Sequence, residues 1–309
     1  MAVAAAGRVR SRAAARRRRG LRLSTALTYL VLISWGAFTL LPILWTYVTS
    51  FKEPVDVFAL PPKLLFPPTL HNYLELFNLD VTTEFENVGA TGSASASSAF
   101  PQYFINSLLV SGATTGLALV LGSLAAYALT RFRFRFGSGL LIGMFMTRLV
   151  PPIAIVVPLY LIWREVGLID TQFALVVTYL SFTLPFVVWL MRGFLKDIPI
   201  DLEEAAMTDG CSRLGALVRI VLPLAAPGLA TTAIFALIGA WNEFLFAVIL
   251  TSGDSKTLPA AILEFKSDKA ILWGRLYAAG DLIMLPVLIF GLVMQKRLVR
   301  GLTGGAVTG

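Results

Sequence analysis

Cysteine and histidine are nearly absent from this 309-residue chain, which has one of each, Cys211 and His71. A single cysteine excludes an internal disulfide, and a single histidine leaves too few ligands for a typical zinc site or a histidine-based catalytic triad. No GxxxxGK[ST] phosphate-binding loop occurs, so the usual motif for binding and hydrolysing ATP is missing. The sequence therefore predicts no redox or metal chemistry, and we expect the chain not to be an enzyme.

Charged residues are also scarce. They make up 14% of the chain, against about a quarter in soluble domains, and the mean hydropathy is +0.77. This composition predicts an integral membrane protein. The net charge of +8 would suggest nucleic-acid binding if the basic residues formed one face of a folded domain. They lie instead in the N-terminal tail and at the ends of apolar runs, so membrane topology explains them better.

Six long apolar runs predict an all-α integral membrane protein with six transmembrane helices. The runs are 23–48, 103–129, 140–163, 173–191, 226–250 and 278–294. In the third run, Pro151, Pro152 and Pro158 remove backbone donors, and we expect a kink beside a cavity.

The basic residues predict the orientation of these runs. Eight arginines in 1–22 indicate a basic cytoplasmic tail before an uncleaved first helix, and basic residues after the second, fourth and sixth runs indicate returns to the cytoplasm. Both termini are then cytoplasmic. The transmembrane domain is 23–298, with an external loop over 50–102 and a cytoplasmic C-terminal tail over 299–309. Within the external loop, the Gly/Ala/Ser-rich stretch 88–98 is predicted to be flexible.

The charged segment 197–223 separates the fourth and fifth runs on the cytoplasmic side. We expect Asp201 to cap a short helix whose first turn carries two glutamates, where carboxylates suit the helix dipole. Gly210 permits a bend or a close backbone approach, Ser212 is a candidate cap for a second helix, and Pro223 stops that helix. The prediction is a helix-turn-helix between two spans.

The same segment carries a spaced motif. Glu204-Ala205-Ala206 is followed after three residues by Gly210, and after nine more by Ile220, one residue, and Leu222-Pro223. This pattern resembles the EAA loop of binding-protein-dependent ABC importer permeases. The resemblance implies that the loop docks on a cytoplasmic ATPase, whereas an amphipathic loop lying on lipid headgroups is the alternative. The residues implied in ATPase coupling are Glu203, Glu204, Ala205, Ala206, Asp209, Gly210, Ile220, Leu222 and Pro223.

Short motifs extend the resemblance over nearly the whole chain, toward carbohydrate permeases of the maltose-transporter type. They are Thr49–Lys52, Asn106-Ser107, Pro151-Pro152, Pro158–Tyr160, Trp241–Phe244 and Val299–Thr303. The resemblance implies a half-channel in the cytoplasmic (inner) membrane. Its partners would be a second homologous permease subunit, two copies of an ATPase subunit and an extracytoplasmic solute-binding protein. ATP and Mg would bind the ATPase, which leaves no cofactor in this chain. The tail residues implied in contacting the ATPase are Arg300, Gly301, Leu302 and Thr303.

Arg148 lies near mid-bilayer in the third run, where an unpaired cation costs about 3 kcal/mol or more. We expect it to pair with Glu243 or Asp281, either beside the translocation path or as a structural ion pair. Trp241 is a candidate for stacking on a sugar or for anchoring at the membrane interface. The candidate substrate-path residues are Asn106, Arg148, Trp241, Asn242 and Glu243.

Three classes of function follow from these observations. The first is an importer subunit for a sugar or polyol, and the lack of a buried cation cluster favours a neutral solute. The second is an ion-coupled secondary transporter in which Glu243 and Asp281 carry protons, although the EAA loop has no role there. The third is a membrane enzyme, which would need a His, Cys or paired-carboxylate cluster at one depth.

Overall fold

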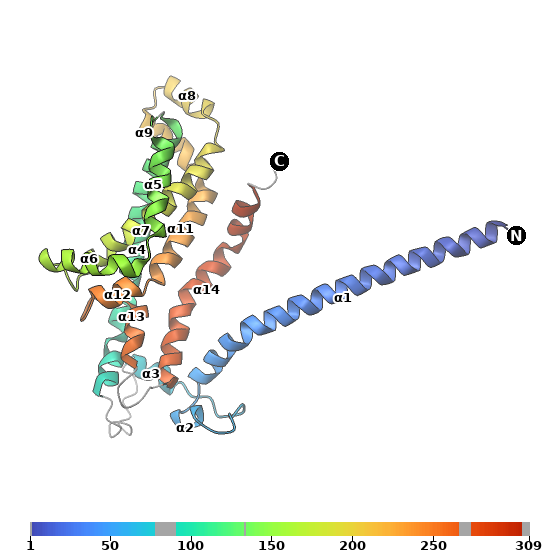
Figure 1. Cartoon of the computed structure of the whole chain (residues 1–309), viewed down its shortest axis with the longest axis horizontal. Helices are drawn as coiled ribbons and strands as arrows, with labels where there is room; N and C mark the ends of the chain where they lie inside the picture. Colours follow the sequence, from blue (N-terminus) through green and yellow to red (C-terminus); the bar gives the residue numbers. More distant parts are fainter. Residues whose placement is uncertain (1, 78–90, 133, 266–272, 305–309) are drawn as a thin grey trace.

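The computed structural model describes residues 2–77, 91–132, 134–265 and 273–304, and all regular structure in these ranges is helical (Figure 1). The helices are α1 (Ala2–Ser50), α2 (Pro54–Val57), α3 (His71–Leu76), α4 (Thr91–Arg131), α5 (Gly137–Leu149), α6 (Pro152–Glu165), α7 (Gln172–Lys196), α8 (Asp201–Thr208), α9 (Arg213–Ala216), η2 (Leu217–Val221), α10 (Leu222–Leu224), α11 (Ala226–Trp241), α12 (Leu245–Leu250), α13 (Leu258–Ala261), η3 (Ile262–Phe265) and α14 (Trp273–Gly304).

Four segments are each long and apolar enough to cross a membrane, and two bent helix pairs bring the number to as many as six. The four are Thr25–Ser50, Ala99–Arg131, Gln172–Lys196 and Trp273–Val293. One bent pair lies in the third apolar run, and the other joins Arg213–Leu224 of the charged loop to the start of the fifth run. The predicted all-α membrane fold is confirmed, with four straight crossings and up to two bent ones.

The third apolar run is broken, not merely kinked. α5 and α6 meet at an angle of 93°, and the residues between them, Val150 and Pro151, are extended with ψ near 124° and 131°. A residue before proline is driven out of the helical region, and proline has no amide hydrogen to continue the ladder, so consecutive prolines explain the break. As a result α6 lies across the direction of the other helices (Figure 1).

The fifth apolar run is interrupted as well. The segment Arg213–Leu224 meets α11 at 80°, and α11 ends at Trp241. The short helix α12 begins only at Leu245, so the predicted continuous helix over 226–250 is wrong. Both broken runs place helix ends inside the bundle, where side chains and backbone can line a cavity.

α4 and α7 form the centre of the bundle and approach closely. A Cβ added at Gly122 of α4 would lie 2.5 Å from Cγ1 of Val187 on α7, so this contact requires a glycine. Small residues allow such close approach of helices in lipid. By contrast α1 extends away from the bundle (Figure 1), and its most apolar 18-residue window contains no buried residue. Only its end packs on the bundle, where Thr49 and Ser50 are buried.

The external loop and the C-terminal tail differ from expectation in part. Helix α4 begins at Thr91, so the backbone of Thr91–Ser98 is helical rather than a flexible excursion, while 88–90 lie outside the described residues. The backbone of Arg300–Thr303 continues α14 as far as Gly304. Residues 305–309, and the side chains of the tail, lie outside the described residues.

Candidate functional site: the α8–α9 loop and a membrane cavity

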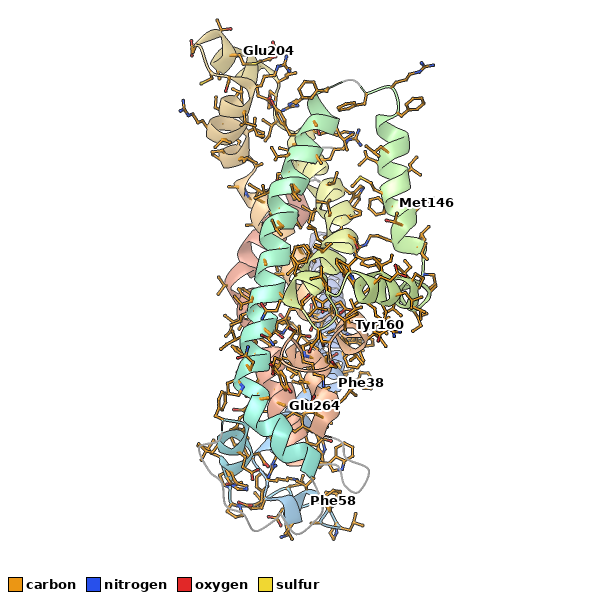
Figure 2. The ribbon with its side chains drawn as sticks, turned by 90° about the vertical axis from the view of Figure 1, so that its left-hand side faces the viewer. Phe38, Phe58, Met146, Tyr160, Glu204 and Glu264 are labelled. Atoms are coloured by element: carbon orange, nitrogen blue, oxygen red, sulfur yellow. The ribbon has the colours of Figure 1, made fainter. Side chains whose placement is uncertain are left out.

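The charged loop projects from one end of the molecule. α8 and α9 lie at the end opposite α2 and α3, and Glu204 is at the extremity opposite Phe58 (Figures 1 and 2). The residues predicted to be cytoplasmic and those predicted to be external are therefore separated by the length of the bundle. This separation agrees with a loop that meets a partner on one side of a membrane.

Gly210 ends α8 in a Schellman motif. The amide of Cys211 donates to the carbonyl of Ala206 at 3.0 Å, and the amide of Gly210 donates to the carbonyl of Met207 at 3.1 Å. Gly210 has φ +92°, a conformation that side chains with a Cβ rarely adopt, and a Cβ added there would have no atom within 4 Å. Of the two roles expected for Gly210, the structure shows the bend and not the close approach.

The second helix of the loop starts as predicted and ends later. Ser212 accepts a hydrogen bond from the Gly215 amide at 3.1 Å and caps α9. The chain then passes through the π-helical turn η2 into α10, so Pro223 lies within the helical segment, which ends at Leu224. A wide π turn accommodates the missing amide hydrogen of Pro223. Asp201 is the first residue of α8 rather than its N-cap, which is Ile200.

Glu203 is buried and holds α8 against the end of α4. Its carboxylate accepts from Arg131 Nε at 2.6 Å and from the Tyr127 hydroxyl at 2.7 Å, and Arg131 also donates to the carbonyl of Ile198 at 2.8 Å. The Arg131 and Glu203 side chains are 8% and 3% exposed. Glu203, grouped with the coupling residues by sequence, therefore acts inside the subunit as a positioning residue. Arg131 and Tyr127 were not singled out by sequence reasoning, although Arg131 ends the second apolar run on the same side as this loop.

The outer face of the loop is exposed and mixed in character. Glu204, Ala205 and Asp209 are exposed, and so are the large apolar side chains of Leu202 (44%) and Leu214 (64%). Ala206 is buried, whereas Ile220 and Leu222 are half-buried and Pro223 is exposed. Apolar side chains gathered around a charge at one end of a molecule are typical of a protein-protein contact.

Arg148 lacks the partner that sequence predicted. All three groups are described, yet no ion pair within 4.0 Å joins Arg148 to Glu243 or Asp281. The guanidinium of Arg148 lies 5.2 Å from the centroid of the Phe186 ring instead. Glu243 accepts from the amides of Phe246 and Ala247 at the start of α12, at 3.0 and 3.2 Å.

Asp281 is occupied elsewhere. It accepts a hydrogen bond from the Tyr73 hydroxyl at 3.1 Å, and Tyr73 also bonds to Ser50 at 2.8 Å. This network joins α14, α3 and the end of α1 at the end of the bundle opposite the α8–α9 loop. Asp281 therefore contacts Tyr73 and not Arg148, and the predicted pairing between Asp281 and Arg148 is wrong.

Two of the candidate path residues belong to the core. Asn106 is fully buried, donates to the carbonyls of Asp254 and Lys256 at 2.6 and 2.8 Å, and accepts from Gln102 and Gln172. It therefore clamps the loop after α12 onto α4. Its side-chain amide is satisfied within the chain, so it has no group left over for a solute.

Trp241 is 3% exposed, packs edge-on against Phe104 and donates to the carbonyl of Ile283 at 3.0 Å. It lines neither of the two described cavities, because packing of α11 against α14 buries it. Asn242 is exposed and bonds only to the carbonyl of Ile238 in its own helix at 3.0 Å, among the described contacts. Of the five candidate path residues, Arg148 and Glu243 alone line a described cavity.

Residues 118–304 match the family described as the binding-protein-dependent transport system inner membrane component. This match covers more than half of the chain, including the α8–α9 loop. The chain belongs to this permease family. It is therefore a transport subunit of an ATP-binding-cassette importer, whose ATPase resides in separate subunits, and it belongs in the inner membrane. An ion-coupled secondary transporter and a membrane enzyme are thereby set aside.

Similar permeases cover most of the chain. The trehalose transport system permease protein SugB of Mycobacterium tuberculosis is 37% identical, over 88% of this permease and 93% of its own length. The trehalose/maltose transport system permease protein MalG of Thermococcus litoralis is 35% identical, over 87% and 92%. The diacetylchitobiose uptake system permease protein DasC of Streptomyces coelicolor is 34% identical, over 87% and 91%.

A solved structure supports the fold. This permease superimposes on a chain of a bacterial ABC transporter that imports the acidic polysaccharide alginate, with a TM-score of 0.70 and 21% identity, over 89% of this permease and 96% of that chain. At this level of identity the likeness concerns the fold alone. It supports the overall all-helical fold described above.

Proposed function

We propose that this permease is one half of the channel in an importer of a neutral sugar or polyol. The names of three similar permeases include trehalose, maltose or diacetylchitobiose, and all of these are uncharged carbohydrates. The other half is a second homologous permease subunit. Two copies of a cytoplasmic ATPase supply the energy, and an extracytoplasmic solute-binding protein delivers the cargo.

The observation that carries this proposal is the contrast between two adjacent glutamates. Glu203 is buried in an ion pair with Arg131, whereas Glu204 is exposed, as are Leu202 and Leu214 of the same loop. The first fixes α8 to α4, and the second is free to bind a partner. Because α8 is tied to α4, displacement of the loop by an ATPase is passed to the transmembrane helices.

The orientation of the subunit follows from the same contact. The α8–α9 loop meets the ATPase, so this end of the bundle and both termini are cytoplasmic, and α2 and α3 face the binding protein. ATP and Mg bind the ATPase subunits, and this permease needs no cofactor of its own. The tail from Val299, which continues α14 toward the loop end, contributes Arg300, Gly301, Leu302 and Thr303 to the ATPase contact.

The test is co-purification and uptake with Glu204→Ala. We expect the wild-type subunit to carry a second permease and an ATPase with it, and to import a sugar in proteoliposomes only when ATP is present. Glu204→Ala should lose the ATPase and at least about ten-fold of the uptake, because the charged contact is lost. Asp197→Asn, which removes another exposed acid outside α8, is the matched control and should leave both intact. Uptake that follows an ion gradient without ATP would contradict the proposal.

A further inference from the structure

A cavity of about 250 Å³ lies where the two broken spans meet α7. Four of its lining residues, Tyr179, Phe182, Thr183 and Glu243, come from α7 and the end of α11. Its volume is close to the lower limit of about 300 Å³ for small-molecule sites, so it has room for one sugar ring rather than a longer chain.

The cavity is lined by one face of α7. Tyr179, Phe182, Thr183 and Phe186 follow one another at intervals of three, one and three residues, which places them on the same side of the helix. The first three line the cavity, and Phe186 holds the guanidinium of Arg148 at its rim. Phe182 also stacks on Phe246 of α12, with ring centroids 4.9 Å apart.

Tyr179 carries a hydroxyl that no well-formed hydrogen bond satisfies. Its side chain is 3% exposed, and its oxygen is buried with no hydrogen-bond partner among the described residues. Glu243 and Thr257 are its polar neighbours, but neither meets it in hydrogen-bonding geometry. A buried hydroxyl left unsatisfied is costly, so such groups in native proteins call for a specific explanation. The position of Tyr179 in the cavity wall provides one, because a small shift of this side chain toward the cavity would let a ligand hydroxyl complete the missing hydrogen bond.

The charged groups of the cavity complement the hydroxyl. The guanidinium of Arg148 lies over the Phe186 ring, and no hydrogen bond from its N–H donors is described, so these donors are available to a ligand. Glu243 accepts one backbone hydrogen bond on each carboxylate oxygen, and each oxygen keeps a further lone pair. Hydroxyl groups both donate and accept, so a polyhydroxylated solute satisfies Arg148, Glu243 and Tyr179 together.

We propose that this cavity is a subsite for one ring of a neutral carbohydrate, held by Arg148, Tyr179 and Glu243 between Phe182 and the break in the third span. The site rests on the proposed function and adds to it that this subunit itself binds the cargo during import. One cation and one carboxylate balance each other, which selects against an acidic sugar. Arg148, Val150 and Gly239 of the wall are exposed on this chain, so the ring enters from the face on which these residues lie.

Two variants test the site without removing any described hydrogen bond within the chain. Tyr179→Phe deletes a hydroxyl that has no described hydrogen-bond partner, so folding should be unchanged or slightly improved. Gly239→Leu fills the cavity, because no atom lies within 4 Å of a Cβ at Gly239. The controls are Tyr160→Phe on α6 and Gly116→Leu on α4, which make the same changes outside the cavity wall.

The measurement is radiolabelled trehalose or maltose imported per ATP hydrolysed, at saturating loaded binding protein, in the complete reconstituted importer. We expect Tyr179→Phe to lower this ratio about two- to ten-fold, as for one lost hydrogen bond, and Gly239→Leu to abolish uptake while ATP hydrolysis continues. Normal uptake by both variants would overturn the subsite and leave the proposed function intact. A wild-type importer that takes up no neutral sugar would overturn both.

Discussion

The ion pair beneath α8 leads to a sharp prediction about how the loop is held. Arg131→Met leaves the Glu203 carboxylate buried at 3% exposure without its cation, and Glu203→Leu leaves Arg131 buried at 8% without its anion. Removing one partner of a buried pair costs about 3–5 kcal/mol, because the remaining charge stays desolvated. The loop can relieve this cost by detaching from α4, so the stability is lost at the contact between α8 and α4 and not across the whole subunit.

That free energy converts into a change in local opening. At 1.36 kcal/mol for each power of ten, the opening equilibrium of α8 rises by about two to nearly four powers of ten. Hydrogen-deuterium exchange of the α8 amides in the assembled importer measures it directly. Asp197→Asn, which removes an exposed acid outside α8, is the matched control and should change this exchange by less than about three-fold.

The double variant separates charge from packing. Arg131→Met combined with Glu203→Leu removes both charges, so no uncompensated ion remains and apolar contact replaces the pair. We expect exchange in the double variant to be closer to that of the wild type than in either single variant. Single variants that exchange like the wild type, or a double variant that is worse than both, would refute the role assigned to the pair.

Two further predictions concern the frame of the subunit. In Gly228→Ala the new Cβ would lie 2.3 Å from Phe194 Cγ, so α7 and α11 must separate, and we expect a loss of about 1–3 kcal/mol in thermal unfolding in detergent. Gly193→Ala, with open space at its Cβ, is the control, and equal unfolding temperatures for the two variants would contradict the packing argument. Asn106→Ala removes the clamp on the carbonyls of Asp254 and Lys256, and should speed deuterium exchange in 252–256 at least ten-fold with little effect on α8. Unchanged exchange there would show that other contacts hold the loop.

Sequence reasoning succeeded where the cause is local. Long apolar runs predicted the straight spans, and the bend at Gly210 and the cap at Ser212 follow from the chemistry of single residues. It failed where the answer depends on which helices face each other. Arg148 lies against an aromatic ring instead of a carboxylate, and the side chains of Asn106 and Trp241 are buried by packing inside the bundle. Periodicity gives the face of a helix but not the helix that covers it.

The break between α5 and α6 also has an electrical consequence. The extended backbone at Val150 and Pro151 interrupts the helix, and such backbone at membrane depth is tolerated only where it is buried in protein or borders water. Water at that level would thin the insulating layer, and the transmembrane potential would then fall across a shorter distance. Arg148, two residues before the break, would lie in that field, where moving one elementary charge through the full potential is worth about 2.3 kcal/mol per 100 mV. Import of an uncharged solute by such a subunit would therefore be accompanied by a displacement current whenever Arg148 changes its depth.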